Sequence, residues 1–336
     1  MNILLRCDYG QNVGMGHLKR CQVLVDVLRE KEDDIFIADY RTDVNLADFL
    51  RKHQIDFQTV ALSDESVHDI ITFIEQQRID LLIVDSYQLA ESFEQQIKQQ
   101  SKVLIFAVDD LFKKHQCDML LNHNLHAEAE QYAGLVDDET QLFCGKSYSL
   151  MSAKNQRLRE ETHPLTYEYF ISMGASDHNN LIPRIIDVLP EAKTVVATTS
   201  LNPNLSDLIA FCDEKAHIDL QIDHENIGLW IKKSKFALVS ASTLMIESIY
   251  LNTVFLAINT VDNQSRNTRF LHSLDFPILR YTELDELVAL IAKVNHHYKF
   301  YQEKVQQLSQ AIGLKTHTLK YEVRNRIRLA PKNTKA

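Results

Sequence analysis

The stretch NILLRCDYGQNVGMGHLKRC, residues 2–21, joins a short apolar run, a glycine-containing turn and the start of an amphipathic pattern. Residues 2–8 are typical of a buried strand that ends in polar residues. After His17 the apolar residues recur at helical spacing, namely Leu18, Cys21, Leu24, Val25 and Leu28. A strand, a tight turn and an amphipathic helix in this order predict the first unit of a doubly wound α/β sheet.

The same alternation continues through the first half of the chain. Four further apolar runs are typical of strands: 34–40, 80–87, 102–110 and 118–124. Amphipathic segments lie between them, for example at 66–77 and 90–99. Continuous apolar strands separated by amphipathic helices predict a parallel sheet that is covered on both faces.

A polar stretch, NQRLREETHPLT at 155–166, interrupts this rhythm, and we interpret it as an inter-domain link. The alternation then resumes, with strand-like runs at 167–174, 193–200, 218–223, 235–241 and 254–259. We therefore predict two Rossmann-like, doubly wound α/β domains over 1–154 and 165–336, the second of which ends in helices. Ligands bind beyond the carboxyl ends of such sheets, so two sheets facing a cleft would suit a two-part ligand.

Composition narrows the class of protein. A formal net charge of -10 argues against broad nucleic-acid binding, which depends on neutralising phosphates. The five cysteines are scattered without a CxxC pair, so we expect free thiols in a reducing compartment. With no signal-like N-terminus and no apolar run near the roughly 20 residues that span a bilayer, we predict a cytoplasmic protein without a membrane partner. The sequence does not fix the oligomeric state, and it is compatible with a monomer.

The first turn suggests chemistry. Gly14 and Gly16 permit positive φ and close approach of the backbone to a ligand. A helix N-terminus favours the neutral form of histidine, so His17 is a candidate proton acceptor, with a capping or packing role as the alternative. Lys19 and Arg20 fall in the first helical turn, where the helix dipole disfavours cations, so they indicate either an anionic ligand or plain solvation.

Turns in the second half are further candidates for anion binding. Small hydroxyl residues at a helix start can bind phosphate, but they are also ordinary N-caps. The candidates share a position just after a predicted strand or in the helix that follows it: Gly174, Ser240, Ser242, Thr243, Glu247, Asn263 and Gln264.

Polar side chains also end two strands of the first half. Asp85 and Tyr87 lie at the expected switch point of the sheet, where we expect them to contact a ligand. Asp109 and Asp110 could bind a metal or a hydroxyl-rich ligand, or simply cap the strand end.

A metal site is the weaker option. His123 and His126 lie three residues apart with Glu128 close by, but the sequence offers no further ligand at a fitting spacing. We therefore predict no metal site and no cofactor.

Taken together, these turns resemble one known family. The run RCDYGQNVGMGHLKR is similar to the opening of the nucleotide-sugar hydrolases of pseudaminic acid biosynthesis, which remove UDP from UDP-2,4-diacetamido-2,4,6-trideoxy-β-L-altropyranose. The similarity continues through LLIVDSY, DDLFKKHQCDMLLNHN, CGKSYSL, FISMGASDHNNL, IDHENI and LVSASTLMIES…VDNQ. It covers most of residues 1–270.

The resemblance implies a glycosyltransferase-B fold and a UDP-sugar substrate. It implies that the C-terminal domain binds UDP through the SAST helix start, Glu247 near the ribose and the Asn263–Gln264 region. It also implies that His17 activates water for attack at the anomeric carbon, with inversion and without a catalytic metal. A glycosyltransferase that uses an acceptor hydroxyl, cleavage of the pyrophosphate, and a non-catalytic nucleotide-sugar-binding protein are the alternatives.

The chain also departs from the family pattern. MSAKNQ follows GKSYSL, where the family commonly has an arginine and an acidic pair, so no role in domain closure or ligand contact carries over there. Ala175 stands where a second glycine is common, which narrows the allowed backbone. The stereochemistry of the sugar is not fixed by these motifs.

Overall fold

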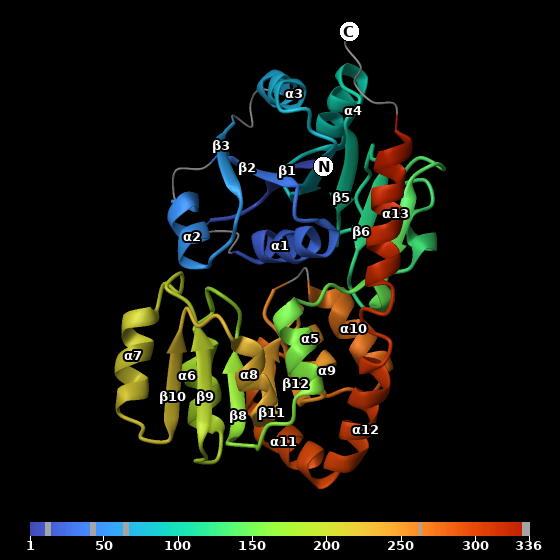
Figure 1. Cartoon of the computed structure of the whole chain (residues 1–336). Coiled ribbons are helices and arrows are strands. Elements are labelled where there is room, and N and C mark those ends of the chain that lie inside the picture. The colour runs from blue at the N-terminus through green and yellow to red at the C-terminus, as the bar shows by residue number, and fades with distance from the viewer. Residues whose placement is uncertain (11–14, 41–44, 63–66, 262–263, 331–336) are drawn as a thin grey trace. The chain divides into compact units, whose positions relative to one another are not determined.

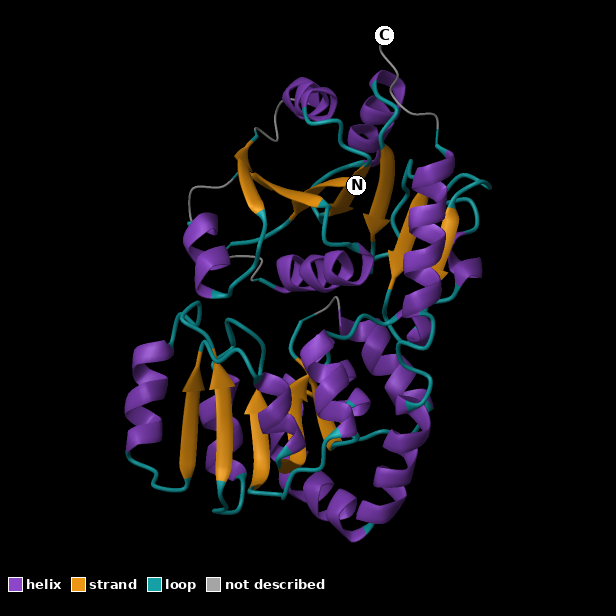
Figure 2. Cartoon of the chain, in the orientation of Figure 1, coloured by secondary structure: helices purple, strands orange, loops and turns teal. Residues whose placement is uncertain are grey.

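The computed structural model describes residues 1–10, 15–40, 45–62, 67–261 and 264–330 (Figure 1). The chain forms two compact units. One unit contains Met1–Leu150 together with the segment from Gly313, and the other contains Met151–Ile312. Each unit has one sheet flanked by helices (Figure 2).

Over the described residues, the first unit holds a seven-stranded sheet of order β3-β2-β1-β4-β5-β6-β7, paired in parallel throughout. Its strands are β1 (Asn2–Cys7), β2 (Asp34–Asp39), β3 (Gln58–Ala61), β4 (Leu81–Asp85), β5 (Leu104–Val108), β6 (Met119–Asn122) and β7 (Gln141–Cys144). Its helices are α1 (Gly16–Leu28), α2 (Leu46–Lys52), α3 (Val67–Gln76), α4 (Glu91–Gln100), η1 (Ala129–Tyr132), η2 (Lys146–Tyr148) and α13 (Thr316–Leu329).

The order of the strands in this sheet reverses between β1 and β4, which lie side by side. Cys7 and Asp85 are partners in the register, so the turns that follow both strands emerge at the same point. The switch point predicted near Asp85 is therefore confirmed, and it is the place where α/β sheets bind ligands.

Burial explains why these segments fold as predicted. The periodic residues of α1, from Leu18 to Leu28, are those that the helix buries. Leu82, Ile105 and Leu120, on three neighbouring strands, belong to one buried apolar cluster. Each such side chain contributes about 1.5–3 kcal/mol when fully buried. The sheet end therefore rests on a packed core that can hold polar side chains in place.

The second unit repeats the architecture with a six-stranded parallel sheet, counted over the same described residues, of order β10-β9-β8-β11-β12-β13. Its strands are β8 (Tyr167–Ser172), β9 (Thr194–Thr198), β10 (Ile218–Ile222), β11 (Ser234–Ser240), β12 (Val254–Asn259) and β13 (Ile278–Arg280). Its helices are α5 (Ala153–Glu160), α6 (Leu181–Val188), α7 (Leu205–Asp213), α8 (Ile227–Lys232), α9 (Thr243–Tyr250), α10 (Ser265–Ser273), η4 (Tyr281–Glu286), α11 (Leu287–His296) and α12 (Tyr298–Ser309). The predicted pair of doubly wound α/β domains is confirmed.

The stretch interpreted as a link contains a helix. α5 begins after Ser152, whose hydroxyl accepts from the Asn155 backbone N–H. Asn155 and Leu158 are buried, and α5 packs on α8 of the second unit. The unusual MSAKNQ segment thus supplies the cap and first turn of this helix. The segment is polar because α5 buries only two side chains, and the sequence therefore showed no clear helical pattern of apolar residues.

The end of the chain also differs from the expected division, in which residues 165–336 form one domain. α13 belongs to the first unit and packs on α1. Arg324 donates to Asp33 at 2.7 Å and to the Leu28 carbonyl at 3.1 Å, while Leu319 and Val323 are buried. The amphipathic pattern of this segment predicted a helix correctly but carries no information about which sheet the helix covers.

None of the helices that the structure describes is long and apolar enough to cross a membrane.

Candidate active site

His17 and Asp85 form the centre of the candidate site. His17 lies in the first turn of α1 and is 6% exposed, and Asp85 ends β4. The Nδ1 atom of His17 is 2.7 Å from Oδ1 of Asp85. Because a carboxylate can only accept, the neutral imidazole carries its proton on Nδ1 and its lone pair on Nε2. Within the described part of the chain, no group bonds Nε2, so this atom can accept a proton.

The capping alternative for His17 does not hold. Met15 is the N-cap residue of α1, and the helix start has no side-chain cap hydrogen bond. The His17 ring instead packs against Tyr87 in an edge-to-face contact, with ring centroids 4.5 Å apart. The ring is therefore held from two sides, by a carboxylate and by an aromatic face.

Arg20 lies one helical turn after His17 and closes the cluster. Its Nε and Nη2 atoms donate to the two oxygens of Asp85, both at 2.5 Å, and its Nη1 donates to Asp110 at 2.7 Å. Arg20 Nη2 and His17 Nδ1 both donate to Oδ1 of Asp85, and for this reason the two nitrogen atoms lie only 2.9 Å apart. Burial alone would lower the pKa of Arg20, but Asp85 and Asp110 raise it well above the ordinary value. Arg20 is thus a permanent cation, and of the two cations only Lys19 is exposed to solvent.

Asp85 is fully buried and ionised. Burial alone would raise the pKa of Asp85, but Arg20 and His17 more than offset that effect and hold the pKa well below its usual range. A permanently ionised carboxylate can orient the imidazole and stabilise the imidazolium that forms when Nε2 accepts a proton.

Tyr87 and Asp110 extend the cluster. The Tyr87 hydroxyl donates to Asp110 Oδ2 at 2.9 Å, and the Tyr87 backbone N–H donates to Asp8 at 2.8 Å. Burial and the nearby Asp110 carboxylate raise the pKa of Tyr87, so its phenol is neutral and remains a hydrogen-bond donor. The structure therefore brings His17, Asp85 and Tyr87 together at the end of β4.

Asp109, by contrast, serves the fold. Its carboxylate accepts backbone N–H groups from Leu111 and Phe112 and the Tyr132 hydroxyl at 2.7 Å. His115 lies between Asp109, 3.8 Å away, and Glu94, 2.8 Å away. Burial alone would lower the pKa of His115, but the two carboxylates raise it to about 9. The strand-end cap is thus the correct interpretation of Asp109.

His115 makes the free energy of unfolding depend on pH. Because folding raises its pKa from 6.5 to about 9, the folded state binds the extra proton. The resulting stability is complete below about pH 6.5 and is lost as the pH rises through 9. We expect the free energy of unfolding to fall by about 3 kcal/mol more in the wild type than in His115→Gln between pH 6 and pH 10, measured by urea denaturation. Parallel pH profiles for the two proteins would contradict this expectation.

The second unit presents its own candidate site at the carboxyl ends of β8 and β11. Gly174 has φ +89°, a conformation that favours glycine. Ser242 is the N-cap residue of α9, but its hydroxyl does not cap the helix and lies 2.9 Å from the Ser240 hydroxyl. The first N–H groups of α9 therefore have no side-chain acceptor from the cap, which leaves them suited to an anion.

Two further predicted residues of the second unit lie on α9 and at the turn after β12. Glu247 follows Thr243 by one turn of α9. Gln264 is 9% exposed, and its side-chain oxygen accepts the Thr260 backbone N–H at 3.0 Å, so it also fixes the turn after β12.

Of the two glycines of the first turn, the structure describes Gly16. Gly16 is the first residue of α1 and does not use the positive φ that glycine permits, and a Cβ there would meet nothing within 4 Å. Helical geometry at this position tolerates any side chain, so only close approach to a ligand would require glycine. Gly14 and Asn263 lie outside the described residues.

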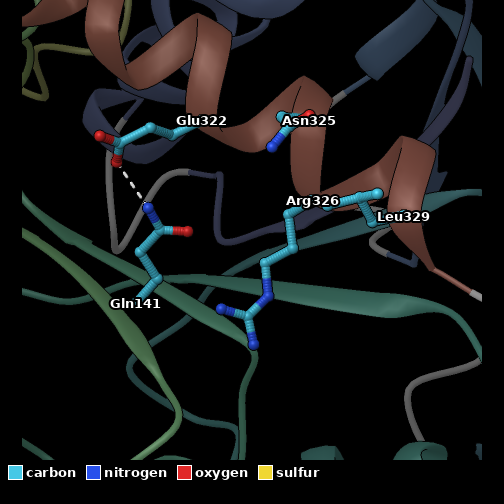
Figure 3. Close-up of a pocket in the computed structure, with 5 residues that line it drawn as sticks. All are labelled: Gln141, Glu322, Asn325, Arg326 and Leu329. Carbon is cyan, nitrogen blue, oxygen red and sulfur yellow. Dashed lines mark hydrogen bonds between the residues drawn. The ribbon is translucent and has the colours of Figure 1, made fainter.

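Among the described residues, no three His, Cys, Asp or Glu side chains converge as metal ligands. A pocket of about 270 Å³ lies in the first unit between β7 and α13 (Figure 3). It is lined by Gln141, Glu322, Asn325, Arg326 and Leu329, and contains none of the predicted site residues.

Sequence reasoning missed the roles of Arg20 and Asp110. Arg20 is three residues after His17 and so lies on the same helix face, and Asp110 follows β5, the neighbour of β4. Both signals are present in the sequence, but only the strand order shows that the two side chains meet.

Comparison with known proteins identifies a relative by sequence and solved structures that share the fold. No family model matches the chain. The protein of Campylobacter jejuni named UDP-2,4-diacetamido-2,4,6-trideoxy-beta-L-altropyranose hydrolase is 36% identical over 272 residues, which are 81% of this chain and 96% of that protein.

Solved structures resemble the chain over nearly its whole length. Arabidopsis thaliana UGT89C1 complexed with UDP-L-rhamnose matches with a TM-score of 0.67 at 9% identity, covering 98% of this chain and 99% of that one. Acinetobacter baumannii MurG matches with a TM-score of 0.57 at 11% identity, covering 98% of each chain. At such identities the likeness shows the fold alone, which is the predicted glycosyltransferase-B architecture.

Proposed function

The chain belongs to the family of UDP-2,4-diacetamido-2,4,6-trideoxy-β-L-altropyranose hydrolases, and on that premise we propose that it releases UDP from this substrate. The bond cleaved is the anomeric C–O bond, and the products are UDP and the free sugar with inverted configuration. The observation that carries the proposal is the His17–Asp85 contact at 2.7 Å, which leaves Nε2 as a proton acceptor. The free sugar would then enter condensation with a three-carbon donor in pseudaminic acid biosynthesis.

In the proposed mechanism, His17 acts as the general base. Nε2 takes a proton from a water whose oxygen forms the new bond to the anomeric carbon on the face opposite UDP. The bond from that carbon to the diphosphate oxygen breaks, UDP leaves with the electron pair, and the proton on His17 passes to solvent. Such a base contributes about 10²–10⁴-fold to the rate. Inversion follows because the attack and the departure occur on opposite faces.

The leaving group explains why one base suffices. UDP is already a stable anion, so its departure needs little help from a general acid. We propose that the start of α9, with Ser240, Ser242 and Thr243, binds the diphosphate through N–H groups and hydroxyls that also stabilise the charge developing in the transition state. The reaction as proposed requires no metal.

Substitution of Glu247 tests where the ribose of UDP binds. If its carboxylate accepts the ribose hydroxyls, Glu247→Gln removes a charge-assisted hydrogen bond and weakens UDP binding by about 10–100-fold. Isothermal titration calorimetry with UDP measures this change. The matched control is Glu214→Gln, which alters an exposed residue at the end of α7 and leaves Kd unchanged. Equal Kd values for Glu247→Gln and the wild type would place the ribose elsewhere.

Product analysis tests the reaction class. The purified protein is incubated with the UDP-trideoxy sugar in the presence of EDTA and without any acceptor, and we expect UDP and free sugar in equal amounts. The glycosyltransferase-B fold also suits an enzyme that transfers the sugar to an acceptor hydroxyl, and such an enzyme would leave the substrate intact. A non-catalytic binding protein would bind UDP and form no product, with or without His17.

A further inference from the structure

Two buried polar atoms beside the His17 cluster have no partner among the described residues. One is Nδ1 of His123, a residue that follows β6 and is 3% exposed. The other is Oδ1 of Asp110, whose second oxygen accepts Arg20 at 2.7 Å and Tyr87 at 2.9 Å. Buried polar groups in folded proteins are nearly always satisfied, by protein, water or ligand. Two such atoms at the carboxyl ends of neighbouring strands indicate a binding position.

The imidazole of His123 is neutral and firmly placed. Burial, together with the nearby Arg20 cation, lowers the pKa of His123 to about 4. The ring therefore carries one N–H donor near pH 7. Its backbone is fixed by the Ser149 hydroxyl, which donates to the His123 carbonyl at 2.7 Å. The preceding residue, Asn122, donates to the Tyr132 hydroxyl at 2.9 Å. A rigid strand end, and not a free loop, thus positions the ring.

Asp110 complements this donor with an acceptor. Its other oxygen is already paired with Arg20, and Oδ1, as a carboxylate oxygen, can only accept a hydrogen bond from a donor. A neutral N–H donor and a carboxylate acceptor together match a secondary amide, which offers one carbonyl and one N–H. Arg20 bridges Asp110 and Asp85, and Asp85 also bonds His17, so these two atoms border the centre where the proposed reaction occurs.

We propose that His123 and Asp110 bind an acetamido group of the substrate sugar. Nδ1–H of His123 donates to the amide carbonyl, and Oδ1 of Asp110 accepts from the amide N–H. This inference rests on the proposed function, whose substrate carries two acetamido groups. Both residues act in binding and specificity, since neither exchanges a proton with the reacting water.

A substrate–variant cycle tests the proposal. The substrates are the UDP-2,4-diacetamido sugar and two analogues in which the acetamido group at C2 or C4 is a free amine. We expect the wild type to prefer the full substrate over one analogue by at least about 100-fold in kcat/KM, because a buried site rejects a ligand that leaves its polar groups unpaired. His123→Leu lowers kcat/KM for the full substrate by about 10–100-fold, mainly through KM, and reduces this preference to a few-fold.

Two variants separate binding from structure. His123→Gln keeps an N–H donor and retains much of the preference. His126→Leu changes a histidine of the same loop and retains all of it. A merely structural role for His123 would lower activity on the full substrate and on both analogues by the same factor. An unchanged preference in His123→Leu therefore overturns the proposal.

A second measurement keeps the proposal testable if His123→Leu does not fold. In His17→Asn, which binds the UDP-sugar but turns it over slowly, the ¹⁵N imidazole signals of His123, assigned by adding His123→Gln, shift when the UDP-sugar binds and stay in place when UDP alone binds. If the His123 signals do not shift when the UDP-sugar binds, the proposal is contradicted. Failure of the wild type to hydrolyse any substrate would instead reject the proposed function, whereas hydrolysis with no effect of His123 on preference rejects only the acetamido site.

Discussion

Replacing His17 with asparagine is expected to lower kcat for UDP-sugar hydrolysis by about 10²–10⁴-fold, the usual contribution of a general base. The asparagine amide can still donate to Asp85 from the position of Nδ1, but it offers no base in place of Nε2. The substitution thus removes the proton acceptor and preserves the buried contact at 2.7 Å. Steady-state assays of UDP release measure the effect.

UDP binding provides the internal reference for this variant. Because the proposed nucleotide site belongs to the second unit, Kd for UDP should stay within a few-fold of the wild-type value. The matched control is His296→Asn, which changes an exposed histidine at the end of α11 and should leave kcat unaltered. A His17→Asn protein that retains kcat would remove His17 from the mechanism.

Replacing Asp85 with asparagine is expected to lower kcat by a similar factor, about 10²–10⁴-fold, and also to destabilise the fold. An asparagine side chain can donate as well as accept, so it no longer specifies the Nδ1–H tautomer of His17. It also removes the negative charge that would stabilise the imidazolium. Rapid-quench measurement of the chemical step, beside UDP binding, separates this loss from any change in affinity.

The loss of stability follows from Arg20. Asp85 accepts two of its hydrogen bonds, and without that charge the buried guanidinium keeps Asp110 as its carboxylate partner among the described residues. Removing one partner of a buried ion pair typically costs about 3–5 kcal/mol. The matched control is Asp80→Asn, an exposed residue just before the start of the same strand, which should leave kcat unchanged. Full activity in Asp85→Asn would show that the carboxylate does not orient the base.

Much of the fold could be predicted because burial leaves a strong pattern in the sequence. Segments such as 80–87 and 102–110 are continuous apolar runs, since both faces of a parallel strand are covered. The position of α13 could not be predicted in this way. The ion pair between Arg324 and Asp33 joins residues far apart in the chain, and neither shows its partner in the local sequence.

In the candidate site, too, some residues could be predicted from the sequence and others depend on the strand order. His17, Asp85 and Tyr87 follow strands or begin a helix, so the general rule for parallel sheets places them at one edge. The role of Arg20 depends on which strands are neighbours, because its two carboxylate partners come from β4 and β5. His123 suggested a weak metal ligand in the sequence, whereas its position near Arg20 indicates a neutral donor.

Hydrolysis in ¹⁸O-water, followed by NMR of the fresh products, shows whether water attacks the anomeric carbon. If a water activated by His17 attacks the anomeric carbon, the label enters the free sugar, UDP stays unlabelled, and the first anomer formed has the configuration opposite to that of the substrate. Label in a phosphate group, with UMP and sugar phosphate as products, would contradict attack at carbon. Retained anomeric configuration would contradict a single displacement by water.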